Sequence, residues 1–421
     1  MVIMRFSRQG DSRLRSRPDG LAYSPQQGHE IERNEMKILI AGGGIGGMSA
    51  AIGLGRLGHE VVVLERTLQP KPVGAGISLQ PNAMQALATL GLDSAIAEQG
   101  CQSTEAFLKH ANGKQIQRFD FSVHLKRYGF LPYTIQRSTL FDILSAAARE
   151  SSVDIRFGYE VDSFKESNDE VVVQTVSNES FRGDTLIGAD GINSRVREQL
   201  LGKQEKRYSG YVCWRGIVAA SDLTDRVDTM NEIWGKGARF GFMPCSPTNI
   251  YWFATKTTPD RTQEVDWKST FRDWPSPVEE LIDTTPNDRI AFNDICDRKP
   301  ISTWNRGRIA LLGDAAHPMT PNFGQGGAQA IEDAVVLSRA FEKCDSVDSA
   351  LKSYERHRNE RANELVIASR QFGSLAQGGG VLQRLIRDNL LPMIPDRVIQ
   401  KKLHQQFDFR SHLDSFECYS T

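Results

Sequence analysis

The chain has 421 residues, which is enough for two or three domains with sizeable hydrophobic cores. Its hydrophobic fraction of 39% and charged fraction of 24% are ordinary for a soluble globular protein. The net charge of −1 argues against general binding to nucleic acid, because proteins that do so are normally basic. No apolar run approaches the roughly 18–20 residues of a membrane span. We therefore expect a cytoplasmic protein without nucleic acid partners and without a transmembrane segment.

The first 35 residues are polar and lack the hydrophobic stretch of a secretory signal, although they carry several arginines: Arg5, Arg8, Arg13, Arg15 and Arg17. We expect residues 1–35 to form a disordered leader. Two alternatives stay open. Acidic residues are scarce before Asp19, as in an organellar transit segment. Met36 directly precedes the first predicted strand, so the start site could also have been assigned too early.

The six cysteines lie far apart and form no CxxC pair: Cys101, Cys213, Cys245, Cys296, Cys344 and Cys418. This spacing favours reduced, incidental thiols over a framework of disulfides or zinc ligands. We expect no metal site in this protein.

The segment 37–66, KILIAGGGIGGMSAAIGLGRLGHEVVVLER, has the pattern of a strand, a glycine turn, a helix and a second strand. Ile38–Ile40 is a short unbroken apolar run, as in a strand that is buried on both faces. Gly42, Gly44 and Gly47 fit GxGxxG. In this motif the first glycine makes the turn, the second lets a pyrophosphate approach the backbone, and the third lets helix and strand pack closely.

A carboxylate stands at the end of the second strand of this segment. Glu65 can accept hydrogen bonds from both ribose hydroxyls and would repel a 2′-phosphate. GxGxxG alone is a weak signal in a chain with 36 glycines, so the flanking strands and helix carry the interpretation. The segment predicts a dinucleotide site, for NAD or for FAD, with these contact residues: Gly42, Gly44, Gly46, Gly47, Glu65 and Arg66.

Two later segments bear on the choice between these cofactors. DTLIGADGINSRVR (184–197) places Asp190 between an apolar strand and a capped helix, which by itself would also suit an ordinary turn. LLGDAAHPMTPNFGQGGAQAIEDA (311–334) puts Asp314 after a strand, where it can bind a polyol hydroxyl, and starts a helix near Gly326. A helix start built from glycines leaves its N–H groups open toward an electron-rich ligand. NAD has no ribityl chain or isoalloxazine ring that could contact the segment 311–334, so the sequence favours FAD. The start of the helix near Gly326 would stabilise the reduced flavin ring.

These three segments in this order resemble the FAD-dependent aromatic hydroxylases, the p-hydroxybenzoate hydroxylase-like monooxygenases, over about residues 36–375. The stretches GAGISLQPNAMQALATLGL (74–92) and QRSTLFDIL (136–144) also match that family. The resemblance implies an α/β fold. A Rossmann-like FAD-binding domain of the glutathione reductase type would carry an inserted, mainly antiparallel β substrate domain.

The resemblance also implies roles for single residues. Arg137 would contact FAD, Asp190-Gly191 would serve FAD and NAD(P)H binding, and Pro321 would lie near the reactive edge of the flavin. Together with the third segment, this predicts further cofactor contacts at Arg137, Asp190, Asp314, Gly324, Gly326 and Gly327. His317 is expected to hold its loop rather than to act as a general base.

The domain boundaries follow from these matches. We predict a discontinuous FAD-binding domain that comprises residues 36–105, 125–205 and 300–375. A substrate domain comprises residues 106–124 and 206–299, and a C-terminal helical segment comprises residues 376–421. All six tryptophans lie between Trp214 and Trp304, in β-prone aromatic stretches. The interrupted amphipathic pattern of residues 381–403 suits packing on the FAD-binding domain or on a partner subunit, so a homodimer stays open.

Strand alternation within ARFGFMP puts Arg239, Gly241 and Met243 on one face, where Arg239 is either a substrate clamp or a surface residue. YSGYVCWRG and KGARFGFMP are similar to bacterial FAD-dependent urate hydroxylases, whose catalytic arginine and tyrosine match Arg239 and Tyr251. Those enzymes have an aspartate at the position of Asn322, which argues against urate as the substrate. YSGY and NFGQGG resemble zeaxanthin epoxidase equally well, so a bulky isoprenoid or polyene stays open.

The resulting hypothesis is an FAD-dependent monooxygenase that hydroxylates or epoxidises a small aromatic or unsaturated compound. The resemblance implies that NADPH or NADH reduces the flavin and that O2 forms a C4a-hydroperoxide on it, whose distal oxygen goes to the substrate. Arg239, Tyr251 and Pro321 are the candidates on the substrate side. The alternatives are a flavin-dependent reductase or dehydrogenase on the same fold, and a non-enzymatic binding protein that keeps the flavin fold.

Overall fold

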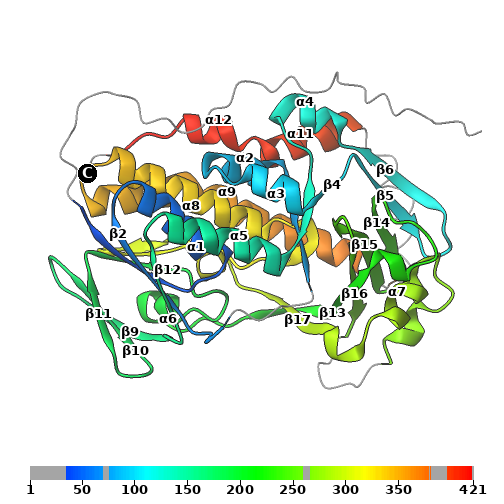
Figure 1. The fold of residues 1–421 in the computed structure, drawn as a ribbon, viewed down its shortest axis with the longest axis horizontal. Helices are drawn as coiled ribbons and strands as arrows, with labels where there is room; N and C mark the ends of the chain where they lie inside the picture. The colour runs from blue at the N-terminus through cyan, green and yellow to red at the C-terminus, as the bar shows by residue number, and fades with distance from the viewer. Residues whose placement is uncertain (1–34, 70–74, 259–265, 379, 381–395, 420–421) are drawn as a thin grey trace, which may run out of the picture. The chain divides into compact units, whose positions relative to one another are not determined.

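The computed structural model describes residues 35–69, 75–258, 266–378, 380 and 396–419. The predicted leader lies outside the described residues except for Glu35, and so does most of the segment 381–403. Figure 1 traces the described strands, which form four sheets.

A six-stranded sheet has the strand order β18-β19-β12-β1-β2-β8. Its strands, in chain order, are β1 (Lys37–Ala41), β2 (Glu60–Glu65), β8 (Asp154–Phe157), β12 (Thr185–Gly188), β18 (Asn305–Arg306) and β19 (Ile309–Leu311). Every neighbouring pair is parallel except β18 with β19. The apolar residues of β1, β12 and β19 are buried, as expected where other layers cover both faces of a parallel sheet.

Three helices pack side by side against one another in Figure 1: α1 (Ile45–Arg56), α5 (Arg137–Glu150) and α8 (Gly326–Lys343), with α9 (Val347–Ala376) against α8. Small residues allow the close approach of α1 and α8. A Cβ on Gly46 would lie 3.1 Å from the Cβ of Ala330, and one on Gly53 would lie 2.1 Å from Oγ of Ser338. The other described α-helices are α2 (Pro81–Thr89), α3 (Asp93–Gln99), α4 (Ser122–Tyr128), α6 (Arg195–Leu201), α7 (Val278–Thr284), α11 (Asp396–Phe407) and α12 (Phe409–Asp414).

A seven-stranded sheet has the order β17-β13-β16-β15-β14-β5-β6 and is antiparallel except for the pair β14 and β5. Its strands are β5 (Glu105–His110), β6 (Gln115–Asp120), β13 (Arg207–Ala219), β14 (Met230–Trp234), β15 (Ala238–Ser246), β16 (Asn249–Thr257) and β17 (Ala291–Asp297). Trp214, Phe240 and Trp252 alternate onto one face, where they form an aromatic core with Phe271. The opposite face carries Arg239 and Tyr251.

Two three-stranded antiparallel sheets complete the fold. One consists of β9 (Val161–Glu166), β10 (Val171–Thr175) and β11 (Ser180–Gly183). The other consists of β3 (Gly76–Leu79), β4 (Cys101–Gln102) and β7 (Tyr133–Gln136), and its β4 and β7 contact β15 of the large sheet. The α/β class, with a parallel sheet and a separate, mainly antiparallel one, is as predicted.

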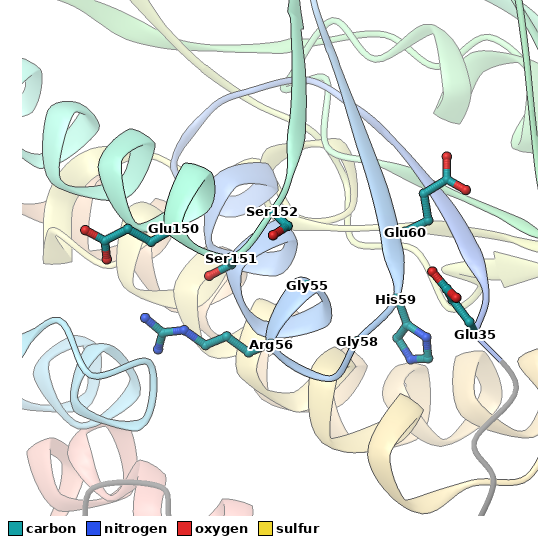
Figure 2. A pocket seen from close by; sticks show the side chains of 9 residues that line it. All are labelled: Glu35, Gly55, Arg56, Gly58, His59, Glu60, Glu150, Ser151 and Ser152. Atoms are coloured by element: carbon teal, nitrogen blue, oxygen red, sulfur yellow. The ribbon is translucent and has the colours of Figure 1, made fainter.

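A surface hollow of about 600 Å³ lies at the amino ends of β1 and β2 (Figure 2). Glu35, Arg56, Glu60 and Glu150 are among its lining residues. In open parallel sheets ligands bind outside the carboxyl ends of the strands. The hollow is therefore at the wrong end of the sheet for a dinucleotide.

A buried ion cluster joins α8 to α9. Arg358 donates to Glu332 at 2.6 Å and to Asp333 at 2.7 Å, and none of these three side chains is exposed. Burial by itself would raise the pKa of Glu332, but the guanidinium groups of Arg361 and Arg358 outweigh it and lower this pKa to about 2. His317 binds Asp333 in the same cluster, so its side chain connects its loop to α8, the position expected for a loop-holding residue.

The C-terminal helices lie against α2 and α9. Gln85 of α2 donates to the carbonyl of Phe407 at 2.7 Å and accepts from the N–H of Arg410 at 3.0 Å. Arg361 of α9 donates to the carbonyls of Gln405 and Gln406. These contacts hold the described part of the C-terminal segment on the helices that flank the parallel sheet.

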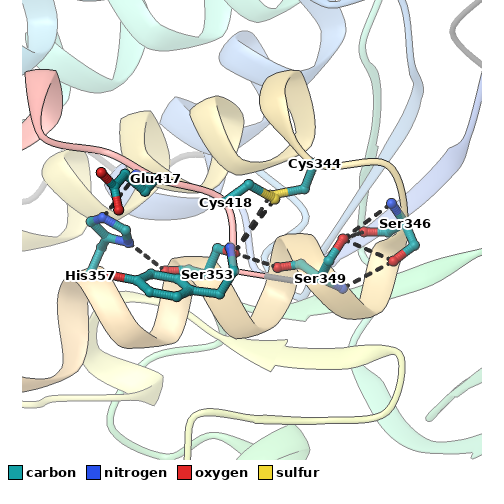
Figure 3. Close-up of a disulfide and its surroundings, with 8 residues drawn as sticks. Cys344, Ser346, Ser349, Ser353, His357, Glu417 and Cys418 are labelled. Carbon is teal, nitrogen blue, oxygen red and sulfur yellow. Dashed lines mark hydrogen bonds between the residues drawn. A yellow bond between two sulfur atoms is a disulfide. The ribbon is translucent and has the colours of Figure 1, made fainter. Parts of the chain in front are cut away.

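The expectation that all cysteines are incidental thiols is wrong for one pair. Cys344, just after α8, forms a disulfide with Cys418, 74 residues later, with the two Cα atoms 5.6 Å apart (Figure 3). The segment after α12 lies along α9, where the N–H of Tyr419 donates to Ser353. The two cysteines are therefore close in space although they are far apart in sequence. Cys101, Cys213 and Cys245 do not take part in a disulfide among the described residues.

Replacing Arg358 with Ala is expected to lower the free energy of unfolding by about 3–5 kcal/mol, because it leaves Asp333 buried without its guanidinium partner and Glu332 with Arg361 alone. Urea unfolding followed by circular dichroism measures this. Lys352→Ala is the matched control in the same helix: Lys352 pairs with Asp348 at the surface, where such a pair is worth less than about 1 kcal/mol. Equal losses for the two variants would contradict the structural role of the cluster.

Reduction of the disulfide is expected to lower the free energy of unfolding by about 2–5 kcal/mol, since it releases a constraint on the unfolded chain. Thermal unfolding with and without dithiothreitol measures the effect. The double variant Cys344→Ser/Cys418→Ser should show no response to the reductant, whereas Cys101→Ser should respond like the wild type. A wild-type midpoint that dithiothreitol leaves unchanged would speak against the cross-link.

Candidate cofactor and substrate site

The glycine turn after β1 has one open position and two crowded ones. Gly42 has a φ of +105°, and a Cβ on it would lie 2.4 Å from the carbonyl oxygen of Ala189. A Cβ on Gly47 would lie 2.0 Å from the carbonyl oxygen of Gly42. A Cβ on Gly44 would meet no atom of the described residues within 4 Å. Gly44 therefore leaves the start of α1, which has no side-chain cap, open to a ligand.

Glu65 lies at the carboxyl end of β2 and faces this turn. Its Oε2 accepts from the N–H of Gly43 at 2.7 Å, and its Oε1 accepts from the N–H of Thr67 at 2.9 Å. A carboxylate has about four lone-pair sites, so acceptor capacity remains for a ribose diol. Arg66 is exposed just beyond the strand, and Gly46 packs on Leu312 and Ala330 rather than toward the turn.

Asp190 follows β12 at the same edge of the sheet. Its Oδ2 accepts from the N–H groups of Arg195 and Val196, at 2.8 and 3.3 Å, and so caps α6. Its Oδ1 is buried and has no hydrogen-bond partner among the described residues. Burial raises the pKa of Asp190, while the hydrogen bond from Ser194 acts against the shift. The free oxygen is thus a buried polar atom that a ligand could satisfy.

Arg197 connects this segment to the next one. It is buried, and its Nη1 donates to the carbonyls of Ala315 and Ala316 at 3.0 and 2.9 Å. Burial lowers the pKa of Arg197 to about 10, so the side chain is still charged at neutral pH. The Asp190 segment and the Asp314 loop are therefore held together by a cation that has no carboxylate partner within the described part of the chain.

Asp314 lies between Gly313 and the start of α8. Asp314 is exposed to solvent, although protein atoms surround its carboxyl group closely. The partial loss of hydration that these atoms cause raises the pKa of the carboxyl, and the charges of His317 and Arg137 oppose this shift. A Cβ on Gly326 would lie 3.9 Å from Oδ1 of Asp314. Arg137, Asp314 and Gly326 are thus neighbours, although they come from distant parts of the chain.

Helix α8 begins without a side-chain cap, as the glycine cluster predicted. Gly324 has a φ of +63° and makes the turn into the helix. Gly327 has a different role, because a Cβ on it would lie 2.7 Å from Cδ1 of Ile77 in β3. The first N–H groups of α8 are consequently available to an acceptor placed beside Asp314.

The strand order brings these groups to one edge. In the parallel sheet β2, β1, β12 and β19 are consecutive neighbours, so their carboxyl ends carry Glu65, the glycine turn, Asp190 and Asp314 side by side. Open helix starts, an unsatisfied buried carboxylate oxygen and an accessible carboxylate fit a dinucleotide that extends over all these strands. FAD meets this requirement through its pyrophosphate, ribityl chain and ring.

On the substrate side, Arg239 is only 3% exposed, which excludes the alternative of a surface residue. Its guanidinium donates to Gln377 at 3.0 Å, to Glu232 at 3.2 Å and to Asn322 at 2.7 Å. Asn322 belongs to the short 3₁₀ turn that begins at the exposed Pro321. Arg239 of β15 is thereby connected directly to the loop that precedes α8.

Tyr251 of β16 lies on the same face as Arg239 but has other partners. A Cβ on Gly76 of β3 would lie 2.5 Å from Cγ of Tyr251, so the tyrosine ring packs directly on that glycine. Arg215 of β13 lies near the Tyr251 hydroxyl, and its charge opposes the rise that burial causes in the pKa of Tyr251. Sequence reasoning missed Arg215 and Tyr211, whose hydroxyl donates to Asn322 at 3.1 Å. The signal that could have found them is strand alternation in YVCWRG, which puts both on the face of β13 that lacks the tryptophan.

Comparison with known proteins decides the family. Residues 35–369 match the model of the family described as FAD binding domain. The chain belongs to this family. The aurachin C monooxygenase/isomerase of Stigmatella aurantiaca is 38% identical over 379 residues, which cover 89% of this chain and 98% of that protein. The FAD-dependent urate hydroxylase of Klebsiella pneumoniae is 36% identical, over 82% of this chain and 91% of its own.

A solved structure agrees with these relatives. The crystal structure of Klebsiella pneumoniae HpxO complexed with FAD and uric acid has a TM-score of 0.82 and 31% identity, and covers 90% of this chain and 98% of its own. The predicted family, cofactor and enzyme class are confirmed: the protein is an FAD-dependent monooxygenase. In the described ranges, this monooxygenase has no helix that is long and apolar enough to cross a bilayer.

Gly47, where a Cβ would be crowded, and Gly44, where it would meet open space, give a matched pair of variants. Gly47→Ala is expected to destabilise even the FAD-free protein by about 3 kcal/mol or more, since its Cβ would overlap the Gly42 carbonyl. Gly44→Ala should keep the stability of the FAD-free protein within about 1 kcal/mol, because the added methyl meets open space. It should nevertheless weaken FAD binding at least about tenfold by obstructing the pyrophosphate.

Thermal unfolding of the FAD-free proteins and titration with FAD by flavin fluorescence measure these two effects separately. Wild-type FAD affinity in Gly44→Ala would show that the pyrophosphate does not approach the backbone at this residue.

Proposed function

We propose that this monooxygenase uses NADPH or NADH and O2 to add one oxygen atom to aurachin C or a closely similar aromatic compound, and that urate is not its substrate. The observation that carries the choice is Asn322. The resemblance to urate hydroxylases implies an aspartate at this position in those enzymes, whereas here an amide oxygen accepts from Arg239 and Tyr211. The high coverage of the aurachin C relative, 98% of its length, supports the same substrate class.

When bound, FAD supplies hydride acceptance from the nicotinamide and the activation of O2. In the proposal the protein holds this cofactor through Glu65, Arg137 and Asp314. The uncapped start of α8 at Gly326 stabilises negative charge on the reduced ring edge, an effect typically worth about 1–2 kcal/mol when partly buried. Pro321 lies at the opposite end of the same turn and borders the reacting edge.

The substrate would lie between this turn and the large antiparallel sheet. We propose that residues 106–124 and 206–299, which contain most of the large sheet, form the substrate domain. The FAD-binding domain would comprise residues 36–105, 125–205 and 300–375. Arg239 and Tyr251 would face the substrate from β15 and β16. The sheet would also keep water from the reacting centre, since access of solvent would favour release of hydrogen peroxide instead of product.

The compartment and the assembly state are also proposals. We place the protein in the cytoplasm, where the Cys344–Cys418 disulfide would have to resist a reducing thiol pool, and we propose a homodimer as the assembly. Sedimentation of the FAD-loaded protein measures the assembly state. Thiol counting on protein isolated under alkylating conditions measures whether the disulfide persists in the cell.

The substrate prediction is tested with purified, FAD-loaded enzyme. Aurachin C should stimulate NAD(P)H oxidation and gain one atom of ¹⁸O from ¹⁸O2, as measured by mass spectrometry. Urate should give less than about a tenth of this stimulation, because exchange of a charged hydrogen-bonding group at a buried site typically costs tenfold or more.

Asn322→Asp provides the matched variant, since it restores the carboxylate that urate hydroxylases carry. Stimulation by urate equal to that by aurachin C in the wild type would contradict the substrate assignment. Rapid NAD(P)H oxidation that yields only hydrogen peroxide with both compounds would show that neither is the substrate.

A further inference from the structure

The disulfide of Cys344 and Cys418 joins the end of the chain to the junction of α8 and α9 (Figure 3). Cys418 is exposed and Cys344 is half-buried. A thiolate in solution can therefore approach the bond from the side of Cys418. Accessible disulfides are the ones that take part readily in thiol–disulfide exchange, so this bond is open to reversible reduction.

The noncovalent contacts beside the disulfide are mostly reached by water. The N–H of Tyr419 donates to Oγ of Ser353 at 3.0 Å, and the guanidinium of Arg356 lies 3.7 Å from the centre of the Tyr419 ring. Phe416 stacks on His357, with a distance of 4.4 Å between the ring centres. Apart from Ser353, these side chains are half-buried or exposed. Segments held by such contacts open locally at low cost in free energy once a covalent bond no longer restrains them.

Helix α12 (Phe409–Asp414) lies between α11 and the disulfide. It has six residues, and so short a helix is not stable by itself in water. Its buried side chains are Phe409 and Leu413. The contacts of α11 hold it at one end and the disulfide restrains it at the other. Release of the disulfide therefore loosens α12 and, through it, the end of α11.

The end of α11 is bound to the buried ion cluster of α8 and α9. Arg361 of α9 donates to the carbonyls of Gln405 and Gln406 at 2.7 and 2.5 Å. Its Nε also donates to Glu332 of α8 at 2.9 Å. Gln405 and Gln406 lie in the last turn of α11, where carbonyls lack partners within the helix. If α11 loosens, Arg361 loses these acceptors, and its bonds to Glu332 change with them because the groups belong to one network.

Glu332 in turn is connected to the start of α8. Nδ2 of Asn82 donates to Oε1 of Glu332 at 2.6 Å and to Oε1 of Gln325 at 2.9 Å. All three side chains are buried. Gln325 directly precedes Gly326, where α8 begins without a side-chain cap. The position of residues 396–419 is thus linked by hydrogen bonds to the helix start at which we expect FAD.

We propose that this disulfide is a reversible redox lock that holds residues 396–419 on α2 and α9, and that its reduction by a dithiol weakens FAD binding. In the exchange, a thiolate of the dithiol attacks the sulfur of Cys418, the S–S bond breaks, and Cys344 leaves as a thiolate. The second thiol of the reductant then attacks the mixed disulfide and releases Cys418. The protein gains two electrons and two protons and becomes a dithiol, while the reductant becomes a disulfide. This inference goes beyond the proposed function, because it concerns retention of the cofactor and not the substrate.

The test measures the dissociation of FAD from the loaded protein on dilution, followed by flavin fluorescence, with and without dithiothreitol. The reduced wild type should bind FAD at least about fivefold more weakly than the oxidised protein, which is the lower end of typical coupling between two sites. Reoxidation with oxidised glutathione should restore the affinity. Because coupling is reciprocal, bound FAD should also shift the thiol–disulfide equilibrium toward the disulfide by the same factor, as measured by thiol counting.

The double variant Cys344→Ser/Cys418→Ser should bind FAD like the reduced wild type in both conditions, and Cys101→Ser should respond to dithiothreitol like the wild type. Hydrogen exchange of the reduced protein should rise in residues 401–419 and stay unchanged in β1. Equal FAD affinity of the oxidised and reduced wild type would overturn the proposal. Unchanged exchange in residues 401–419 would do the same, and so would an equal rise in β1, which would mean global unfolding. Because no substrate takes part, the result is independent of whether aurachin C is oxygenated.

Discussion

The geometry of the cofactor site depends on one buried carboxylate, that of Asp333. Its Oδ2 accepts from the N–H of Gly313 at 3.0 Å and binds His317, and its Oδ1 accepts from Arg358 at 2.7 Å. Asp333 lies about two turns into α8, so these bonds fix the open start of that helix relative to the Asp314 loop. Burial by itself would raise the pKa of Asp333, but the charges of His317 and Arg358 outweigh it and lower that pKa. The carboxylate stays charged because all its partners are present.

Many polar side chains beneath α8 are hydrogen-bonded to one another, whereas several polar groups at the site are left open. The polar groups beneath α8 are paired with one another: Asn82 binds Gln325 and Glu332, and Gln329 binds both as well. In contrast, the starts of α1 and α8 have no side-chain cap, and one oxygen of Asp190 has no partner among the described residues. Open polar groups are costly in a folded protein. The open groups at this sheet edge are ones that a large polar cofactor could satisfy.

The substrate side combines two arginines with opposite surroundings. Arg239 is tied to three protein groups, and through Asn322 it joins the large sheet to the turn at Pro321. Asn322 is itself held by the carbonyl of Ser369 and packs closely on Gly373 of α9. Among the described residues Arg215 forms no ion pair and donates to Asn293 at 3.0 Å. Arg239 is therefore suited to holding the sheet and the cofactor turn together.

The sequence alone determined the cofactor half of the protein. GxGxxG at Gly42, the carboxylate at Glu65 and the glycine helix start at Gly326 are short patterns whose spacing is dictated by local geometry, so they predicted a dinucleotide site and favoured FAD, and the family resemblance that they carry implied the fold class. The tertiary structure alone decided which distant groups meet: Cys344 with Cys418, and Arg239 with Asn322. The physical reason is that periodicity specifies the face on which a side chain lies. Its partner depends on strand order and helix packing, which are set by the burial of surfaces far apart in the chain.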